Sequence, residues 1–121
     1  MPQPISFNRF HVYTLRRPLA PNSIIKFALV VTNDKFSNRR DQPVVSVLFL
    51  SPTPRTLETA LRIKIECRTS GGTAHLPFDH YVMVDQLTPV PPNLLMETSG
   101  TEITEYEKRE VNAKLRDYLD L

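Results

Sequence analysis

The sequence is poor in cysteine, glycine and tryptophan, and these shortages exclude several classes of protein. The single cysteine, Cys67, cannot form an internal disulfide, so we expect a cytoplasmic protein rather than a disulfide-stabilised secreted one. With 3 glycines in the chain, no GxGxxG motif or P-loop is present. The longest apolar run, residues 47–50, is far too short to span a membrane, and the N-terminus has no signal-peptide character.

The usual signatures of metal enzymes and serine hydrolases are also missing. The sequence has no HExxH motif and no paired cysteines. His75 and His80 stand on either side of a predicted turn, without the nearby acidic cluster that a zinc site would use. Ser51 lacks the flanking glycines of a nucleophile elbow. We therefore expect neither a metal nor a cofactor.

The composition indicates one globular domain, residues 1–121, with an uneven distribution of charge. Apolar residues make up 40% of the 121, which is enough to bury a single core. The net charge is only +2, yet residues 1–68 carry 11 Lys or Arg against 4 Asp or Glu, and residues 69–121 carry 4 against 9. A basic first half of this kind favours contacts with a polyanion. No proline follows Pro92, which predicts strands and rigid loops first and a helix afterwards.

The hydrophobic pattern predicts five strands, which we expect at residues 7–15, 24–32, 44–50, 57–66 and 80–85. The second and third runs are almost continuously apolar, so both faces of these strands should be buried. The fourth run alternates and should be half exposed, with Arg62 on its polar face. Loops are expected at 16–23 and 35–42, and a rigid proline-rich exit at 88–92.

The C-terminal segment has the pattern of an amphipathic helix. Thr104 and Glu107 have the spacing of a capping box. An apolar stripe follows at helical spacing, formed by Val111, Leu115, Tyr118 and Leu119. Together these elements predict a mainly β fold with a C-terminal helix (α+β): a small, strongly bent antiparallel sheet or barrel.

Two polar residues on the buried strands form the most informative chemical pattern. Lys26 interrupts an apolar strand, and Ser51 ends the next one. If these strands are neighbours, an ammonium and a hydroxyl face one small volume, flanked by basic loops that carry Arg16, Arg17 and Arg55. Such a site suits a phosphodiester, whose oxygens take both charge and hydrogen bonds. The same residues also fit a purely structural role, in which the Lys26 side chain extends to solvent and Ser51 only ends its strand.

Several segments resemble the MazF/PemK/Kid family of toxin endoribonucleases. Residues 28–38 read Ala-Leu-Val-Val-Thr-Asn-Asp-Lys-Phe-Ser-Asn, and a strand that ends at Ser51 follows a short loop. Residues 82–88, Val-Met-Val-Asp-Gln-Leu-Thr, are similar to the family's strand that ends in an acidic residue and Gln. The helix that opens at residues 103–105 also fits, and the resemblance extends from residue 9 to residue 119.

The resemblance implies a small SH3-like barrel, a homodimer and neutralisation by a cognate antitoxin. It also implies metal-independent cleavage of single-stranded RNA or mRNA through the ribose 2′-hydroxyl, which leaves a 2′,3′-cyclic phosphate. The residues expected to act are catalytic Lys26 and Ser51, and RNA-binding Arg16, Arg17, Arg55, Asp85 and Gln86.

The chain departs from the family pattern at important positions. Lys26 stands where the family usually carries Arg, and Lys lacks the bidentate geometry of a guanidinium. Met83 replaces an Arg that some members carry two residues before the acidic position, whereas Asp85 is retained. We therefore expect weaker or altered RNase activity.

Two other functions fit parts of the sequence. The first is a barrel that binds RNA or a protein but has lost catalysis. The second is a CcdB-like gyrase poison, because residues 10–17 resemble the first strand of that family. The gyrase poisons act through a C-terminal Trp-Gly-Ile, however, and this chain ends Tyr-Leu-Asp-Leu without tryptophan.

Overall fold

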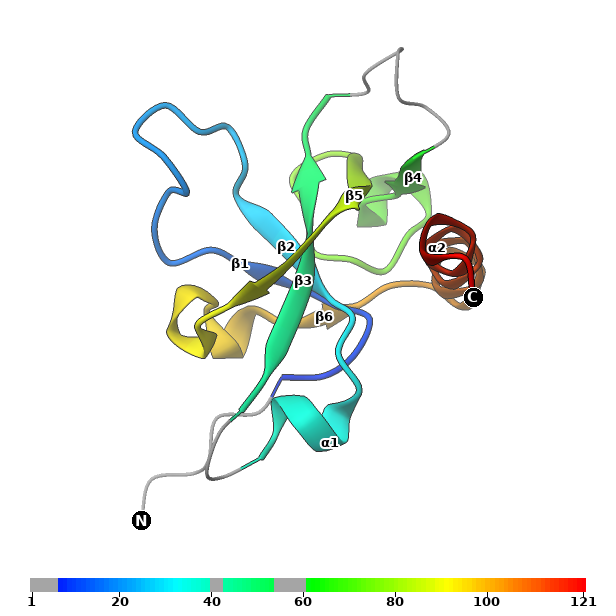
Figure 1. The fold of residues 1–121 in the computed structure, drawn as a ribbon. Coiled ribbons are helices and arrows are strands. Elements are labelled where there is room, and N and C mark those ends of the chain that lie inside the picture. The colour runs from blue at the N-terminus through cyan, green and yellow to red at the C-terminus, as the bar shows by residue number, and fades with distance from the viewer. Residues whose placement is uncertain (1–6, 40–42, 54–60) are drawn as a thin grey trace.

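The computed structural model describes residues 7–39, 43–53 and 61–121, which form a curled antiparallel sheet and a long C-terminal helix (Figure 1). The strands are β1 (His11–Thr14), β2 (Phe27–Val30), β3 (Val45–Ser51), β4 (Arg62–Ile65), β5 (His80–Val90) and β6 (Thr101–Glu102). The α-helices are α1 (Asp34–Ser37) and α2 (Glu105–Leu119), and the 3-10 turns are η2 (Arg68–Ser70), η3 (Pro92–Leu94) and η4 (Glu97–Ser99).

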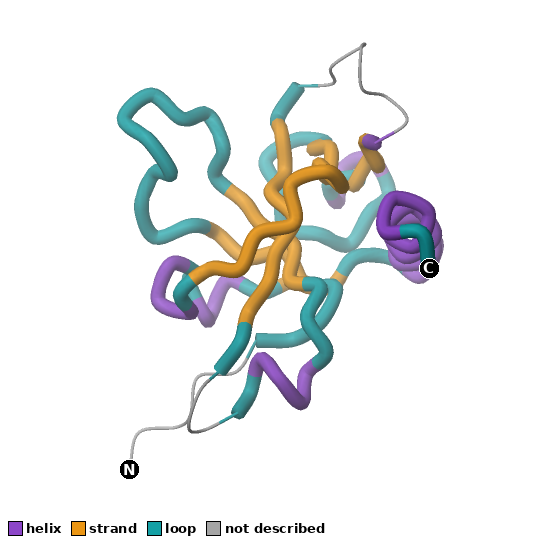
Figure 2. The backbone as a smooth tube through the Cα atoms, in the orientation of Figure 1, coloured by secondary structure: helices purple, strands orange, loops and turns teal. Residues whose placement is uncertain are grey.

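The six strands have the order β4-β5-β3-β2-β1-β6, and all neighbours are antiparallel. The pairing of β3 with β5 shifts register between Leu48 and Leu50, and a bulge of this kind bends the strands. The strands cross near the middle of the molecule, while the connection from β1 to β2 projects to one side (Figure 2). The predicted mainly β, strongly bent barrel with a C-terminal helix is confirmed.

Apolar clusters cover both faces of the central strands. Leu29 and Leu48 belong to one cluster, which α2 completes with Val111 and Leu115. Ala28 belongs to the opposite cluster, because successive residues of a strand point to opposite faces. The prediction that β2 and β3 are buried on both sides is therefore confirmed.

Helix α2 begins with the predicted capping box. The Thr104 hydroxyl accepts a hydrogen bond from the Glu107 N–H (3.1 Å), and the Glu107 carboxylate accepts one from the Thr104 N–H (2.9 Å). The predicted stripe is correct for Val111 and Leu115, which are buried. It is wrong for the last turn, where Tyr118 and Leu119 remain 46% and 45% exposed because the core cluster ends at Leu115.

The segment between β4 and β5 turns sharply and links the two edges of the sheet. Gly71 has a φ of 101°, and a Cβ on Gly72 would clash with the Glu66 carbonyl oxygen, so both positions of this turn require glycine. The Thr73 hydroxyl then donates to the Glu102 carbonyl oxygen on β6 (2.6 Å). The His75 N–H donates to the Thr101 hydroxyl (3.0 Å). These bonds close the curled sheet on its open side.

The elements differ from the predictions at several places: β2 is shorter than the predicted strand 24–32, β6 is not among the five predicted strands, and three other differences have a visible cause. Strand β1 starts only at His11, because Phe10 adopts a left-handed φ of 64°. Helix α1 forms in a predicted loop, since the Asn33 side chain caps the Lys35 N–H (3.0 Å). Strand β5 continues through the predicted exit, because residues 87–90 pair with residues 45–48 of β3. Among the described residues, no helix is both long and apolar enough to cross a membrane.

Candidate functional site

Two adjoining cavities open beside the connection between β1 and β2. The first, here called the Ser51 cavity, has a volume of about 410 Å³ and is lined by Asn22, Ser23, Ile24, Ile25, Ser51, Arg62, Met83 and Gln86. The second, here called the Lys26 cavity, has a volume of about 390 Å³ and is lined by Thr14, Leu15, Arg16, Arg17, Pro18, Pro21, Ser23, Ile25 and Lys26. Ser23 and Ile25 line both cavities and therefore form the ridge between them.

Ser51 is the last residue of β3 and pairs with Tyr81 of β5. Its side chain is almost buried, with 4% of the residue exposed. The hydroxyl donates to the Thr53 carbonyl oxygen (2.9 Å) and accepts from the Thr53 N–H (3.3 Å). To bind a phosphate in the cavity, the Ser51 hydroxyl would therefore have to donate its hydrogen bond to the phosphate instead of to the Thr53 carbonyl oxygen.

Lys26 lies immediately before β2 and is exposed. The two strands are neighbours, since Phe27 pairs with Leu50 and the register carries Lys26 opposite Ser51. The side chains nevertheless line different cavities, because Lys26 lies with Arg16 and Arg17 on the far side of the ridge. The ammonium and the hydroxyl thus lie at the same end of two paired central strands rather than in one pocket.

The cation that does line the Ser51 cavity is Arg62, which the sequence pattern placed on an exposed strand face. Arg62 pairs with Met83 in the register of β4 and β5. Its Nη1 lies 2.6 Å from Asp85 Oδ1, and the two side chains are 5% and 23% exposed. Nη1 also donates to the Leu61 carbonyl oxygen (3.3 Å). Asp85 lies within β5, which continues to Val90. Its carboxylate therefore has a fixed position on the sheet, from which it orients the buried guanidinium of Arg62.

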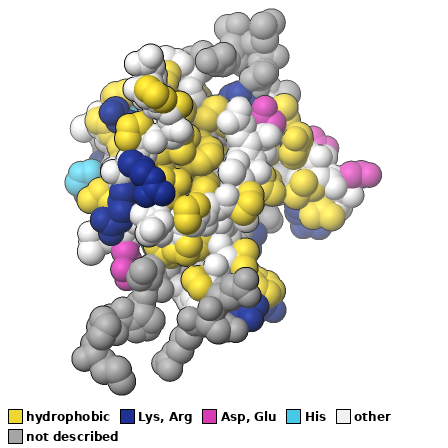
Figure 3. Space-filling model, turned by 60° about the vertical axis from the view of Figure 1, so that its left-hand side comes forward, with side chains coloured by type: hydrophobic (Ala, Val, Ile, Leu, Met, Phe, Trp, Pro, Cys, Tyr) yellow, Lys and Arg dark blue, Asp and Glu magenta, His cyan; other side chains and the backbone are white. Residues whose placement is uncertain are grey.

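The remaining predicted RNA-binding residues do not all line the Ser51 cavity. Gln86 is exposed and lines the Ser51 cavity. Arg16 and Arg17 line the Lys26 cavity, and Arg16 is held in place by its Nε bond to the Leu95 carbonyl oxygen (3.2 Å). Figure 3 shows Lys and Arg side chains gathered on the face toward which the connection between β1 and β2 projects. Arg55 lies outside the described residues.

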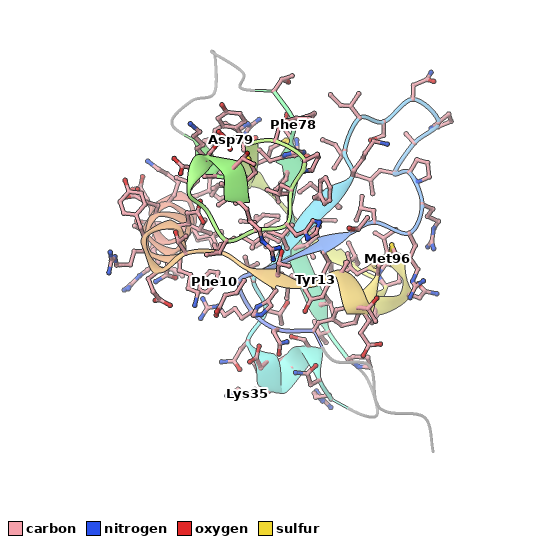
Figure 4. The ribbon with its side chains drawn as sticks, turned by 180° about the vertical axis from the view of Figure 1, so that it is seen from behind. Phe10, Tyr13, Lys35, Phe78, Asp79 and Met96 are labelled. Carbon is pink, nitrogen blue, oxygen red and sulfur yellow. The ribbon has the colours of Figure 1, made fainter. Side chains whose placement is uncertain are left out.

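Outside the two cavities, Phe78 and Asp79 lie next to each other on the segment that precedes β5 (Figure 4). The Cys67 N–H donates to Asp79 Oδ1 (2.9 Å) and lowers the pKa of that carboxyl to about 2. Asp79 is thereby explained as an anchor of the β4–β5 connection. In the described part of the chain, no three His, Cys, Asp or Glu side chains are grouped to hold a metal ion.

Comparison with protein families gives a match over nearly the whole chain. Residues 8–119 match the family model described as PemK-like, MazF-like toxin of type II toxin-antitoxin system. Among curated protein sequences, none matches the chain significantly.

Proposed function

The chain belongs to the PemK-like, MazF-like toxins of type II toxin–antitoxin systems, and we propose that it is an endoribonuclease that cleaves single-stranded RNA without a metal. The family implies an antitoxin partner. The proposal includes a homodimer that acts on mRNA in the cytoplasm. The observation that carries it is the pair of adjoining cavities, one with a nearly buried hydroxyl and the other lined by three cations.

The two cavities suit consecutive phosphates of one RNA strand. A phosphodiester chain carries one charge per nucleotide, so a bound scissile phosphate needs cations where the flanking phosphates lie. The Ser51 cavity would hold the scissile phosphate, and Lys26, Arg16 and Arg17 would hold a neighbour across the ridge formed by Ser23 and Ile25.

In the proposed reaction the ribose O2′ bonds to the adjacent phosphorus while the bond from phosphorus to O5′ breaks. The O2′ proton leaves to a base and O5′ receives a proton, so the products are a 2′,3′-cyclic phosphate and a 5′-hydroxyl. The Ser51 hydroxyl donates to a non-bridging oxygen as charge grows there. Lys26 is exposed, which favours charge neutralisation over the role of base, because lysine gives up its proton readily when it is desolvated.

The test is end-mapping of RNA after incubation with the pure protein in EDTA. We expect fragments that end in a 2′,3′-cyclic phosphate, with cleavage about 10²-fold slower for Ser51→Ala and slower also for Lys26→Ala. Lys114→Ala, on α2, is the matched control and should cleave like the wild type. RNA that stays intact in EDTA, from a protein that still arrests growth, would contradict the proposal.

One observation favours a second candidate, a module that binds RNA or a protein without cleaving it. The Ser51 hydroxyl is already engaged by the Thr53 backbone, and Lys26 lines a different cavity. For such a module, Ser51→Ala and Lys26→Ala would match the wild type in both RNA cleavage and toxicity.

A further inference from the structure

We propose that Arg62 is the phosphate-binding cation of the Ser51 cavity and that Asp85 holds it in position. This inference rests on the proposed function and deepens it, because it names the charged group that Lys26, in the neighbouring cavity, does not supply. The residues involved come from three strands: Ser51 from β3, Arg62 from β4 and Asp85 from β5.

Charge is the first argument. Among the described residues that line the Ser51 cavity, Arg62 is the one that carries a formal charge; the others are apolar or neutral. An anion that enters beside the Ser51 hydroxyl therefore meets the guanidinium as its nearest positive group within the cavity. Gln86 and Asn22 add neutral amides to the same wall, which suit hydrogen bonds to a base or a sugar.

Burial is the second argument. The Arg62 side chain is 5% exposed, and a charge withdrawn from water is unfavourable unless it is paired. A buried ion pair can often be replaced by apolar residues without loss of stability, so packing alone does not require Arg62 on β4. Its position in the wall of a cavity that also holds a nearly buried hydroxyl is the arrangement that anion binding needs.

The geometry of the ion pair is the third argument. The bonds to Asp85 and to the Leu61 carbonyl oxygen both use Nη1. A guanidinium is a planar fork with five donors, so a carboxylate at one nitrogen fixes the direction of the others. Asp85 thus acts as a positioning residue. Arg62 supplies the positive charge for the non-bridging oxygens, while Ser51 donates a hydrogen bond from β3, on the other side of β5.

The test compares Arg62→Lys, Arg62→Gln, the charge-exchanged double variant Arg62→Asp with Asp85→Arg, and the matched control Arg109→Lys on the exposed surface of α2. Each is measured for melting temperature, for kcat and KM of RNA cleavage, and for binding of a single-stranded RNA made uncleavable by 2′-deoxy sugars. We expect Arg62→Lys to melt close to the wild type and to lose roughly a hundredfold in kcat. The exchanged variant should regain stability relative to Arg62→Gln but not cleavage. Arg109→Lys should change none of these values.

Two results of the cleavage assays overturn the inference. One is full cleavage by Arg62→Lys under conditions where Ser51→Ala is inactive, and the other is recovery of cleavage together with stability in the exchanged variant, which marks a structural ion pair. Measurement of RNA binding distinguishes failure of this inference from failure of the proposed function. If the wild type binds RNA but does not cleave it, Arg62→Gln should still reduce the slope of log affinity against log salt by about 0.7. An unchanged slope, or a wild type that binds no RNA, rejects the phosphate contact.

Discussion

At the scale of single residues, His80 shows how burial sets the behaviour of a titratable group. The residue is 3% exposed, and its ring stacks on Phe78 (4.8 Å between centroids) and meets Phe27 edge to face (5.1 Å). Its Nδ1–H donates to the Phe78 carbonyl oxygen (2.8 Å), because a carbonyl can only accept. Burial lowers the pKa of His80, against smaller opposing effects of that bond and of the Asp79 charge.

This lowered pKa predicts a loss of stability in mild acid. An unfolded histidine titrates near pH 6.5, so below about that pH the unfolded chain binds a proton that the folded chain resists. Stability is then full above pH 6.5 and falls as the pH decreases through that value. His80→Phe keeps an apolar ring and removes the titration. Its free energy of unfolding in urea should change less than that of the wild type between pH 7.5 and 5.5.

His75→Gln serves as the control for this prediction, because His75 is exposed. It should retain the pH dependence of the wild type. Equal slopes for the wild type and His80→Phe would show that His80 does not contribute to the acid sensitivity.

At the scale of elements, one carboxylate connects the terminal helix to the sheet. Glu107 lies in the first turn of α2, is 4% exposed, and accepts hydrogen bonds from two backbone N–H groups. One is on Thr104 (2.9 Å), within the capping box, and the other is on Glu66 (2.8 Å), just after β4. Glu107 therefore also determines where the helix lies against β4, the edge strand that carries Arg62.

Replacement of this residue should destabilise the protein more than a cap alone does. Glu107→Ala leaves both N–H groups without their acceptor, which we expect to cost about 2–4 kcal/mol. Thr104→Ala, which removes only the hydroxyl of the box, should cost about 1 kcal/mol. Unfolding in urea measures both, with Glu110→Ala on the same helix as the control. A loss for Glu107→Ala no larger than that for Thr104→Ala would mean that the Glu66 bond contributes nothing.

The pairing of β4 with β5 also alters the meaning of a departure noted in the sequence. The resemblance drawn from the sequence puts Met83 at a position where an arginine is expected in some members, which suggests a lost cation. In the folded chain Arg62 lies opposite Met83 and bonds to Asp85, two residues farther along. The neighbouring strand thus returns a guanidinium to the same face of the sheet.

At the scale of the whole molecule, folding turns the uneven charge of the chain into a local basic surface. Arg16, Arg17 and Lys26 line one cavity. Acidic residues of the second half are partly neutralised near the start of α2, where Lys108 pairs with Glu102 (2.7 Å) and Glu105 (2.8 Å). A net charge of +2 is therefore compatible with a strongly attractive site for an RNA strand.

This arrangement predicts that RNA affinity depends on salt through particular cations. Lys26→Gln or Arg17→Gln should each lower the slope of log affinity against log salt by about 0.7, because each removes one phosphate contact with a single strand. Binding of an uncleavable single-stranded RNA between roughly 50 and 200 mM salt measures the slope. Lys114→Gln should leave it unchanged, and an equal decrease for all three variants would indicate general rather than local electrostatics.

Much of the fold was predictable because its causes are local or periodic. Continuous apolar runs identified β2 and β3 as buried strands, and the spacing of Thr104 and Glu107 identified the start of α2. The end of β5, by contrast, depends on a partner elsewhere in the chain. Strand β5 extends to Val90 only because Val45 is there to pair with it, and no local pattern records that contact.

The sequence by itself determined the mainly β fold, the capped terminal helix and the family, since each follows from short-range spacing or from similarity along the chain. Only the tertiary structure decided that Lys26 and Ser51 line separate cavities and that Arg62 joins Ser51 instead. The physical reason is register. Whether a side chain on β4 meets Asp85 or water depends on how two strands separated by a turn are aligned and bent, and that alignment is fixed by packing of the whole sheet.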